Sequence, residues 1–381
     1  MRRLAVFLVG LAACGDEWKP EAAFPEVSAR VEALRGLKLD PKPEFRVWTR
    51  EEWISSVRAE AKAPAGDYDF LWKTLGIVPE GEDFLAADRR LKERFRGYYD
   101  IADDVLSYMA DTPKAAREAQ LAHSLIHVLQ AQHSSLFELP SDEETAGYLD
   151  DVSWAWTAAR EGEAVLYELA WPGDSVDGAR KKIETLLGRY AIPDAPRYAV
   201  RWAYFAHVAG ARYLLARSKD GLRAASDALH TSPPMSTEQV LHPERGDPPL
   251  VVVPPELKGW RRTVRTVLGE WTLADWLQTA GDDIGGGLPD DLRWGGDLTC
   301  VYRKGEDACV VAWTVWDDEP SAERFMKRVA DSGIVARRGK RVVVALGPAK
   351  GAVRPLLSFG LRTLRATPFR NLDELEDVVA R

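Results

Sequence analysis

In the first two thirds of the chain, apolar residues follow the helical period. In one long run, Leu121, Leu125 and Val128 fall on a single helix face. Thr49 and Glu52 have the pattern of a capping box, which predicts a helix from there to about residue 62. Long helices are expected over residues 114–136, 143–171 and 196–217, and shorter ones over 25–35, 84–95 and 271–279.

Short segments rich in β-branched and aromatic residues predict strands. In the first half these are residues 44–48 and a hairpin of 97–100 with 105–109. The last third has the order strand–strand–helix–strand–strand, which indicates a small α+β domain with an antiparallel sheet. Its predicted elements are residues 298–303, 308–316, 321–330, 334–336 and 341–346. We therefore expect a mainly α domain with a small β-sheet over residues 40–255, followed by a small α+β domain over residues 256–381.

Composition and charge exclude several classes of protein. The 381 residues are 46% hydrophobic and 29% charged, which excludes an intrinsically disordered chain. Lys and Arg total 51 against 59 Asp and Glu, and this acidic balance argues against a nucleic-acid partner. The cysteines are Cys14, Cys300 and Cys309, too few for a disulfide-dense scaffold or a Cys-rich zinc module.

The N-terminus has the pattern of an export signal. Arg2 and Arg3 precede an uncharged apolar segment at 4–13, which is shorter than the roughly 20 residues of a membrane-spanning helix. Residues 11–14 (LAAC) resemble the lipobox of bacterial lipoproteins. This resemblance implies a signal peptide over residues 1–13 and a lipidated Cys14 that anchors the protein to a membrane of the bacterial cell envelope. Residues 14–39 would form the tether and first helix, with the body outside the cytoplasm; a plain signal peptide is the alternative.

The candidate chemistry centres on His123 and His127. Two histidines four residues apart lie on one helix face, one turn apart, where their imidazoles can converge on a zinc ion. Without further residues, the pair fits equally well with two polar side chains in a seam between helices.

Glu161 is the candidate third ligand. It lies 34 residues beyond His127 in the next predicted helix, where a zinc site often finds its carboxylate. Gly162 beside it costs about 1 kcal/mol relative to Ala inside a helix. A close approach of another backbone would explain that glycine. Glu163 is interpreted as an exposed helix position.

Four sequence blocks resemble a family of bacterial zinc metallopeptidases similar to the gluzincins. Residues 121–133 (LAHSLIHVLQAQH) resemble its H-E-x-x-H-A-L-Q-D-Q-H block, and residues 161–164 (EGEA) its E-G-[DE]-A block. Residues 236–243 (STEQVLHP) match its S-T-E-Q-[VI]-L-H-P block. Residues 97–100 (GYYD) resemble the hairpin that precedes the helix with the two metal-binding histidines in that family. The resemblance covers roughly residues 40–250. It implies a gluzincin-like fold and a zinc site formed by His123, His127 and Glu161.

The chain departs from this family at one position. Ser124 stands where the family has the Glu that serves as general base for the attacking water. A Ser hydroxyl is uncharged near neutral pH and cannot accept that proton. A general base typically contributes about 10²–10⁴-fold to the rate. The sequence thus predicts a zinc site without its usual base.

The other polar residues of interest have weaker roles. His242 is a candidate for stabilising an oxyanion or for capping local backbone, and Glu238 beside it belongs to the ordinary family pattern. His133 is expected to act structurally at a helix end, His207 to be a packed core residue and His230 to lie in a loop.

Three functions stay open from the sequence. The first is an envelope-anchored pseudopeptidase that binds a peptide, a protein partner or metal without efficient hydrolysis. The second is an active zinc-dependent hydrolase whose general base has moved to another residue. The third is a metal-free structural or interaction protein.

Cys300 and Cys309 are candidates for a disulfide. They lie nine residues apart on the arms of the predicted hairpin, and a four-residue turn at 303–306 would place them opposite each other. Export to an oxidising compartment favours such a bond.

Overall fold

The structure is a computed structural model that describes residues 18–60, 66–93, 97–141, 145–171, 178, 182–183, 196–278 and 283–380. It combines α-helices with three small sheets in this part of the chain. The predicted lipobox and Cys14 lie outside the described residues. No helix among the described residues has both the length and the apolar character needed to cross a membrane.

Two compact units make up the fold, and each draws on three stretches of sequence. The first unit takes its described residues from Met1–Ala63, Phe84–Glu138 and Trp156–Pro233. The second takes them from Pro64–Asp83, Leu139–Ala155 and Pro234–Arg381. These units do not follow the predicted boundary at 255/256, because residues 64–83, 139–155 and 234–255 all belong to the second unit.

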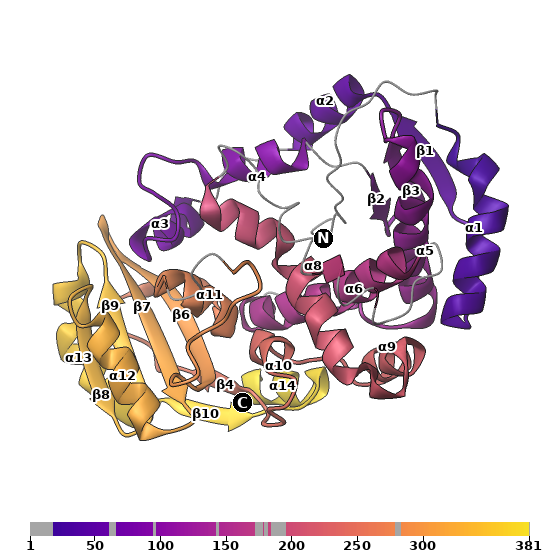
Figure 1. Cartoon of the computed structure of the whole chain (residues 1–381). Helices are drawn as coiled ribbons and strands as arrows, with labels where there is room; N and C mark the ends of the chain where they lie inside the picture. Colours follow the sequence, from indigo (N-terminus) through magenta and orange to yellow (C-terminus); the bar gives the residue numbers. More distant parts are fainter. Residues whose placement is uncertain are drawn as a thin grey trace. The chain divides into compact units, whose positions relative to one another are not determined.

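Helices dominate the first unit (Figure 1). Its small sheet has the order β1-β3-β2, with β1 parallel and β2 antiparallel to β3. The strands are β1 (Glu44–Trp48), β2 (Gly97–Asp100) and β3 (Val105–Met109). The helices are α1 (Pro20–Arg35), α2 (Arg50–Glu60), α4 (Phe84–Lys92), α5 (Arg117–His133), α6 (Asp150–Ala170, from Trp156 onward), α8 (Arg197–Arg217) and α9 (Leu222–Thr231).

Most of these elements agree with the sequence patterns. Strands β1, β2 and β3 have the predicted bounds. The capping box is confirmed, since the Thr49 amide donates to Glu52 Oε2 at 2.8 Å and the Glu52 amide to Thr49 Oγ1 at 3.2 Å. Helix α1 begins five residues earlier than predicted, with Pro20 in its first turn, a position where the missing amide hydrogen costs nothing. Helix α9 was not predicted.

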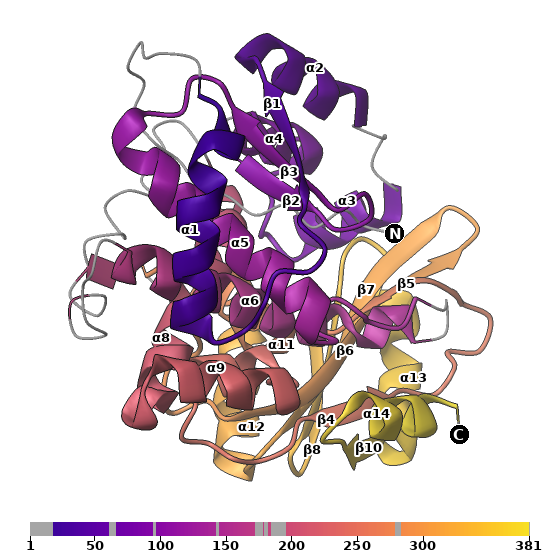
Figure 2. The same ribbon diagram turned by 90° about the vertical axis from the view of Figure 1, so that its right-hand side faces the viewer.

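Helix α5 is enclosed on nearly all sides. Every residue from Gln120 to Gln130 is buried, and α1 runs alongside it (Figure 2). Strand β2 also contacts α5. A helix buried all round is normally apolar, so the polar side chains within this run need specific partners.

Helices α6 and α8 approach each other through two glycines. A Cβ atom on Gly162 would collide with the backbone of Gly210, and one on Gly210 with the carbonyl group of Ala158. The close approach predicted from Gly162 is therefore confirmed, and α8 is the partner. It places the middle of α8 directly against the turn of α6 that carries Glu161.

The second unit is built on a five-stranded antiparallel sheet in the order β5-β6-β7-β9-β8. Its strands are β5 (Arg261–Thr266), β6 (Trp294–Lys304), β7 (Asp307–Trp316), β8 (Ile334–Arg338) and β9 (Arg341–Leu346). Helices α12 (Glu319–Val329) and α13 (Lys350–Thr363) pack on it. The unit also contains α3 (Gly66–Thr74), α10 (Thr237–Leu241), α11 (Gly269–Trp276), α14 (Leu372–Val379) and the strand pair β4 (Leu250–Val253) and β10 (Arg365–Pro368).

The strand–strand–helix–strand–strand order predicted for this region is confirmed by β6, β7, α12, β8 and β9. The predicted four-residue turn is wrong, because Lys304 pairs with Asp307. Cys309 consequently lies opposite Tyr302, while Cys300 lies opposite Val311. Such diagonal neighbours are about 7–8 Å apart, too far for a disulfide. Both cysteines are buried free thiols, which corrects the predicted cross-link.

Candidate metal centre

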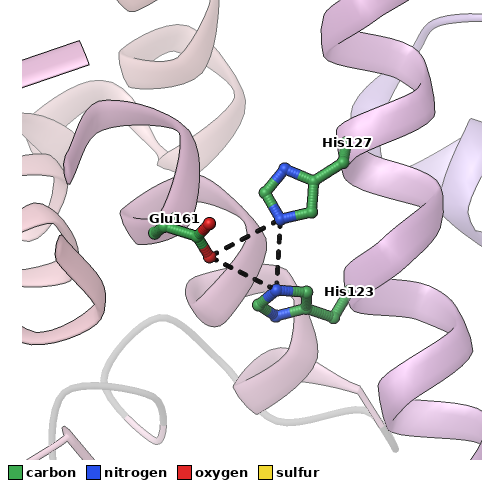
Figure 3. A group of neighbouring side chains, drawn as sticks. All are labelled: His123, His127 and Glu161. Atoms are coloured by element: carbon green, nitrogen blue, oxygen red, sulfur yellow. Dashed lines mark hydrogen bonds and ion pairs between the residues drawn. The ribbon is translucent and has the colours of Figure 1, made fainter. Parts of the chain in front are cut away.

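His123, His127 and Glu161 converge in the interior of the first unit (Figure 3). The two imidazoles project from consecutive turns of α5 toward the carboxylate on α6. The Nε2 atoms of the histidines are 3.2 Å apart, and each is 3.6 Å from Oε2 of Glu161. We call these three residues the His–His–Glu group.

This triangle has the dimensions of a metal site. With metal bonds of about 2.0–2.1 Å in a tetrahedron, ligand atoms lie about 3.3 Å apart. The two contacts with Glu161 are not hydrogen bonds, since 3.6 Å is too long and Glu161 Oε2 is buried with no hydrogen-bond partner among the described residues. Two imidazoles and one carboxylate are a typical donor set for zinc. The residues present therefore fit a divalent cation.

The histidines of the group are electrostatically unequal. Burial disfavours a charged His123, but Glu161 and Glu168 outweigh burial and raise its pKa to about 9. Burial lowers the pKa of His127. Burial would raise the pKa of Glu161, yet the facing imidazoles hold it well below its ordinary value. Since a metal binds the neutral imidazole, the raised pKa of His123 makes metal binding compete with protonation of this ring.

Each histidine also contacts a second polar side chain through its other ring nitrogen, Nδ1. His123 Nδ1 lies 3.1 Å from Oε2 of Glu168, one of the last residues of α6. His127 Nδ1 lies 2.8 Å from Oε1 of Gln130 on its own helix. These contacts leave both Nε2 atoms directed toward Glu161, as metal-binding histidines require.

Ser124 lies within the enclosed part of α5 and is 3% exposed. Burial raises the pKa of Tyr108 on β3, and the Ser124 hydroxyl opposes this rise. In the described part of the chain, the carboxylates that contact the imidazoles of the group are Glu161 and Glu168. Both are already engaged, Glu161 as a candidate ligand and Glu168 behind His123. The position at which the resemblance expects a general base thus holds a neutral hydroxyl.

His207 on α8 is a site neighbour that the sequence pattern did not identify. It is buried as predicted, at 2% exposure, but its Nε2 lies 3.3 Å from Glu161 Oε2. Its ring stacks on that of His123 with centroids 6.4 Å apart. The available signal was Gly210, one turn further along α8, which pairs with the glycine beside Glu161.

Two other sequence interpretations need correction. Glu163 is fully buried rather than exposed. Its carboxylate accepts hydrogen bonds from Arg35 Nε at 2.7 Å and Gln130 Nε2 at 2.8 Å, and lies 2.9 Å from His230 Nε2. His230 belongs to helix α9 and not to a loop. His133 acts at the end of α5 as expected, with Nε2 at 2.7 Å from the Lys38 carbonyl oxygen.

His242 belongs to the second unit. It caps the C-terminal end of α10, and its Nε2 lies 2.9 Å from Oε1 of the buried Glu270. Glu238 on the same helix is buried, and burial together with Glu270 raises its pKa to about 9. The structure places His242 beside Glu270. The role of His242 toward an oxyanion stays a prediction.

Comparisons with protein-family models, curated proteins and solved structures found no match to this chain. The resemblance to zinc metallopeptidases therefore rests on the sequence blocks alone. The case for a metal centre rests on the geometry of the His–His–Glu group.

Proposed function

We propose that this chain is a zinc-binding, peptidase-like protein that does not hydrolyse peptides efficiently. The observation that carries the proposal is the buried triangle of two Nε2 atoms and one carboxylate oxygen, with Glu161 Oε2 lacking a hydrogen-bond partner in the described part of the chain. Ser124 in place of a carboxylate supports the loss of efficient hydrolysis.

Each residue has a defined task in this proposal. His123, His127 and Glu161 hold the cation, and Glu168 and Gln130 orient the two imidazoles. Zinc, when bound, supplies a Lewis acid that polarises oxygen atoms of a ligand such as a peptide carbonyl. Ser124 offers no proton acceptor, so the proposed role is binding of metal together with a peptide or protein partner.

The first test is metal content. The purified mature protein should carry about one zinc ion per chain by elemental analysis, and His123→Ala should lose it. His133→Ala is the matched control, because this histidine lies at the end of the same helix and contacts a backbone carbonyl instead. A wild-type protein that neither retains nor takes up zinc would support the metal-free interaction protein instead.

The second test is proteolysis of an unfolded substrate. We expect no chelator-sensitive cleavage by the wild type and a gain of cleavage in Ser124→Glu. Cleavage by the wild type that a chelator and His123→Ala both abolish would establish the active hydrolase with a relocated base.

We also propose, from residues 1–14, that the protein is anchored to a membrane of the bacterial cell envelope through a lipid on Cys14. Cys14→Ser should move the protein from the membrane fraction to the soluble fraction. An unchanged distribution would contradict the anchor.

A further inference from the structure

The side chain of Gln130 connects the His–His–Glu group to a second buried cluster. It is fully buried on α5, three residues beyond His127. Its oxygen faces His127 Nδ1 at 2.8 Å. Its nitrogen lies 2.8 Å from Glu163 Oε2 and 3.0 Å from the carbonyl oxygen of Arg160. Both ends of one amide are therefore occupied.

The partners of the amide determine its orientation. A carbonyl oxygen such as that of Arg160 can only accept a hydrogen bond, and the Glu163 carboxylate beside it is paired with the Arg35 guanidinium. The NH₂ group of Gln130 must then face these two acceptors. Its oxygen, which can only accept, is left facing His127, so His127 Nδ1 must be the donor.

The tautomer of His127 follows from this. With the hydrogen on Nδ1, a neutral imidazole has its lone pair on Nε2, the atom that faces Glu161 and His123. We propose that Gln130 is a positioning residue that sets this tautomer and thereby prepares His127 to bind the metal. The inference rests on the proposed zinc site and extends it to residues that do not touch the cation.

Glu163, Gln130 and His127 form a chain of contacts that we call the relay, and Glu163 is the end away from the candidate metal ligands. Arg35 of α1 donates to it at 2.7 Å, and His230 of α9 lies 2.9 Å from it. Arg35 also pairs with Asp227 of α9. The orientation of the Gln130 amide thus depends on side chains from α1, α6 and α9, which explains why a carboxylate is buried so close to the site.

The experiment compares Gln130→Met with Gln132→Met. The control residue is on the same helix and also uses both amide atoms, accepting from the Asp40 amide at 3.0 Å and donating to the Pro41 carbonyl at 2.8 Å. It contacts no metal-ligand candidate in these two bonds. Two quantities are measured: the tautomer of His127 in the metal-free full chain, by ¹⁵N NMR of labelled histidine, and the zinc dissociation constant, by competition with a chromophoric chelator.

We expect the metal-free wild type to carry the His127 hydrogen on Nδ1. Gln130→Met should mix the tautomers and weaken zinc binding by about 10–100-fold, the typical effect of removing such a support, while Gln132→Met leaves both unchanged. A wild-type tautomer with the hydrogen on Nε2, or a Gln130→Met protein with wild-type tautomer and affinity, would overturn the relay.

The two readouts separate this inference from the proposed function. Suppose that the wild type has the expected tautomer and that Gln130→Met disturbs it, but that no zinc binds. This result would support the role of Gln130 and contradict the proposed zinc site. If Gln130→Met fails to fold, the wild-type tautomer alone decides, since an Nδ1 hydrogen supports the relay and an Nε2 hydrogen contradicts it.

Discussion

Both units bury carboxylates, and in two sets of them, one from each unit, the pKa values shift in opposite directions. In the first unit Glu161 and Glu163 are buried, and their pKa values are lowered because imidazoles and Arg35 face them. In the second unit burial raises the pKa of Asp151 to about 7 and that of Asp297 to about 6.

The partners of the second set explain the contrast. Asp297 accepts from the backbone amides of Leu268 and Gly269 at the start of α11, and Asp151 accepts from the amide and hydroxyl of Thr237 at the start of α10. Neutral donors satisfy hydrogen bonds but compensate a buried charge less than a cation does. Burial alone therefore does not decide the direction of a carboxylate's pKa shift; the surrounding charges do.

The largest expected effect separates two buried Glu–His pairs. Glu161→Gln should weaken zinc binding by more than the about 10–100-fold that loss of a supporting residue costs, because it removes the charged oxygen that faces both histidines of the group. Glu270→Gln, which alters the 2.9 Å contact with His242, should leave zinc binding unchanged. Chelator competition measures both. A loss of affinity in Glu270→Gln would show that His242 and Glu270 take part in the same metal site.

The next effect concerns stability. Glu163→Ala should destabilise the protein by about 3–5 kcal/mol, because it leaves the guanidinium of Arg35 buried without its main partner. Chemical denaturation measures the change. Glu323→Ala removes an exposed pair with Lys327 in the second unit and should cause no measurable change. Equal effects of the two substitutions would contradict the special role of the Glu163 cluster.

A smaller effect is expected from two helix glycines. Gly210→Ala should cost about 1–3 kcal/mol, because the added methyl group meets the backbone of α6. Gly351→Ala in α13 of the second unit has open space around the new methyl group and should stabilise by about 0.4–1 kcal/mol. Thermal unfolding compares them. A neutral Gly210→Ala would mean that α6 and α8 can separate without loss.

The smallest effect is a difference in pH dependence between the units, over pH 4.5–6.5. Asp151 and Asp297 bind protons more tightly when folded, so their contribution to stability decreases as pH rises from about 4 toward 7. His127 and His207 have lowered pKa values and bind protons more weakly when folded. Their contribution therefore increases as pH rises toward the ordinary histidine value of about 6.5.

Native-state hydrogen exchange of the metal-free protein, corrected for the intrinsic rate, checks this difference. Protection in α11 and β6 should fall with pH over this window, while protection in α5 should rise. Asp297→Asn should flatten the first trend and leave the second. Parallel trends in the two units would contradict the opposite electrostatics inferred here.

The sequence alone predicted the core of the candidate site. Spacing along a helix is a local property, so His123 and His127 could be placed on one face before any tertiary contact was known. Gly162 indicated a close helix contact beside Glu161, because a glycine destabilises a helix interior relative to alanine and a close contact would require it. The succession strand–strand–helix–strand–strand along the second unit followed in the same way from local patterns.

Other features depended on which elements pack together. Glu163 looked like an exposed helix position until Arg35 and His230, far away in sequence, proved to surround it. His207 reached the site only because α8 crosses α6 at a glycine pair. The register of β6 and β7 shifted with a turn two residues shorter than predicted, and this separated Cys300 from Cys309. Periodicity indicates which residues share a face of an element, whereas the charge or thiol that a side chain contacts belongs to another segment. The spacing of the candidate ligands was therefore predictable from the sequence. The charged residues that surround them were determined by the tertiary structure.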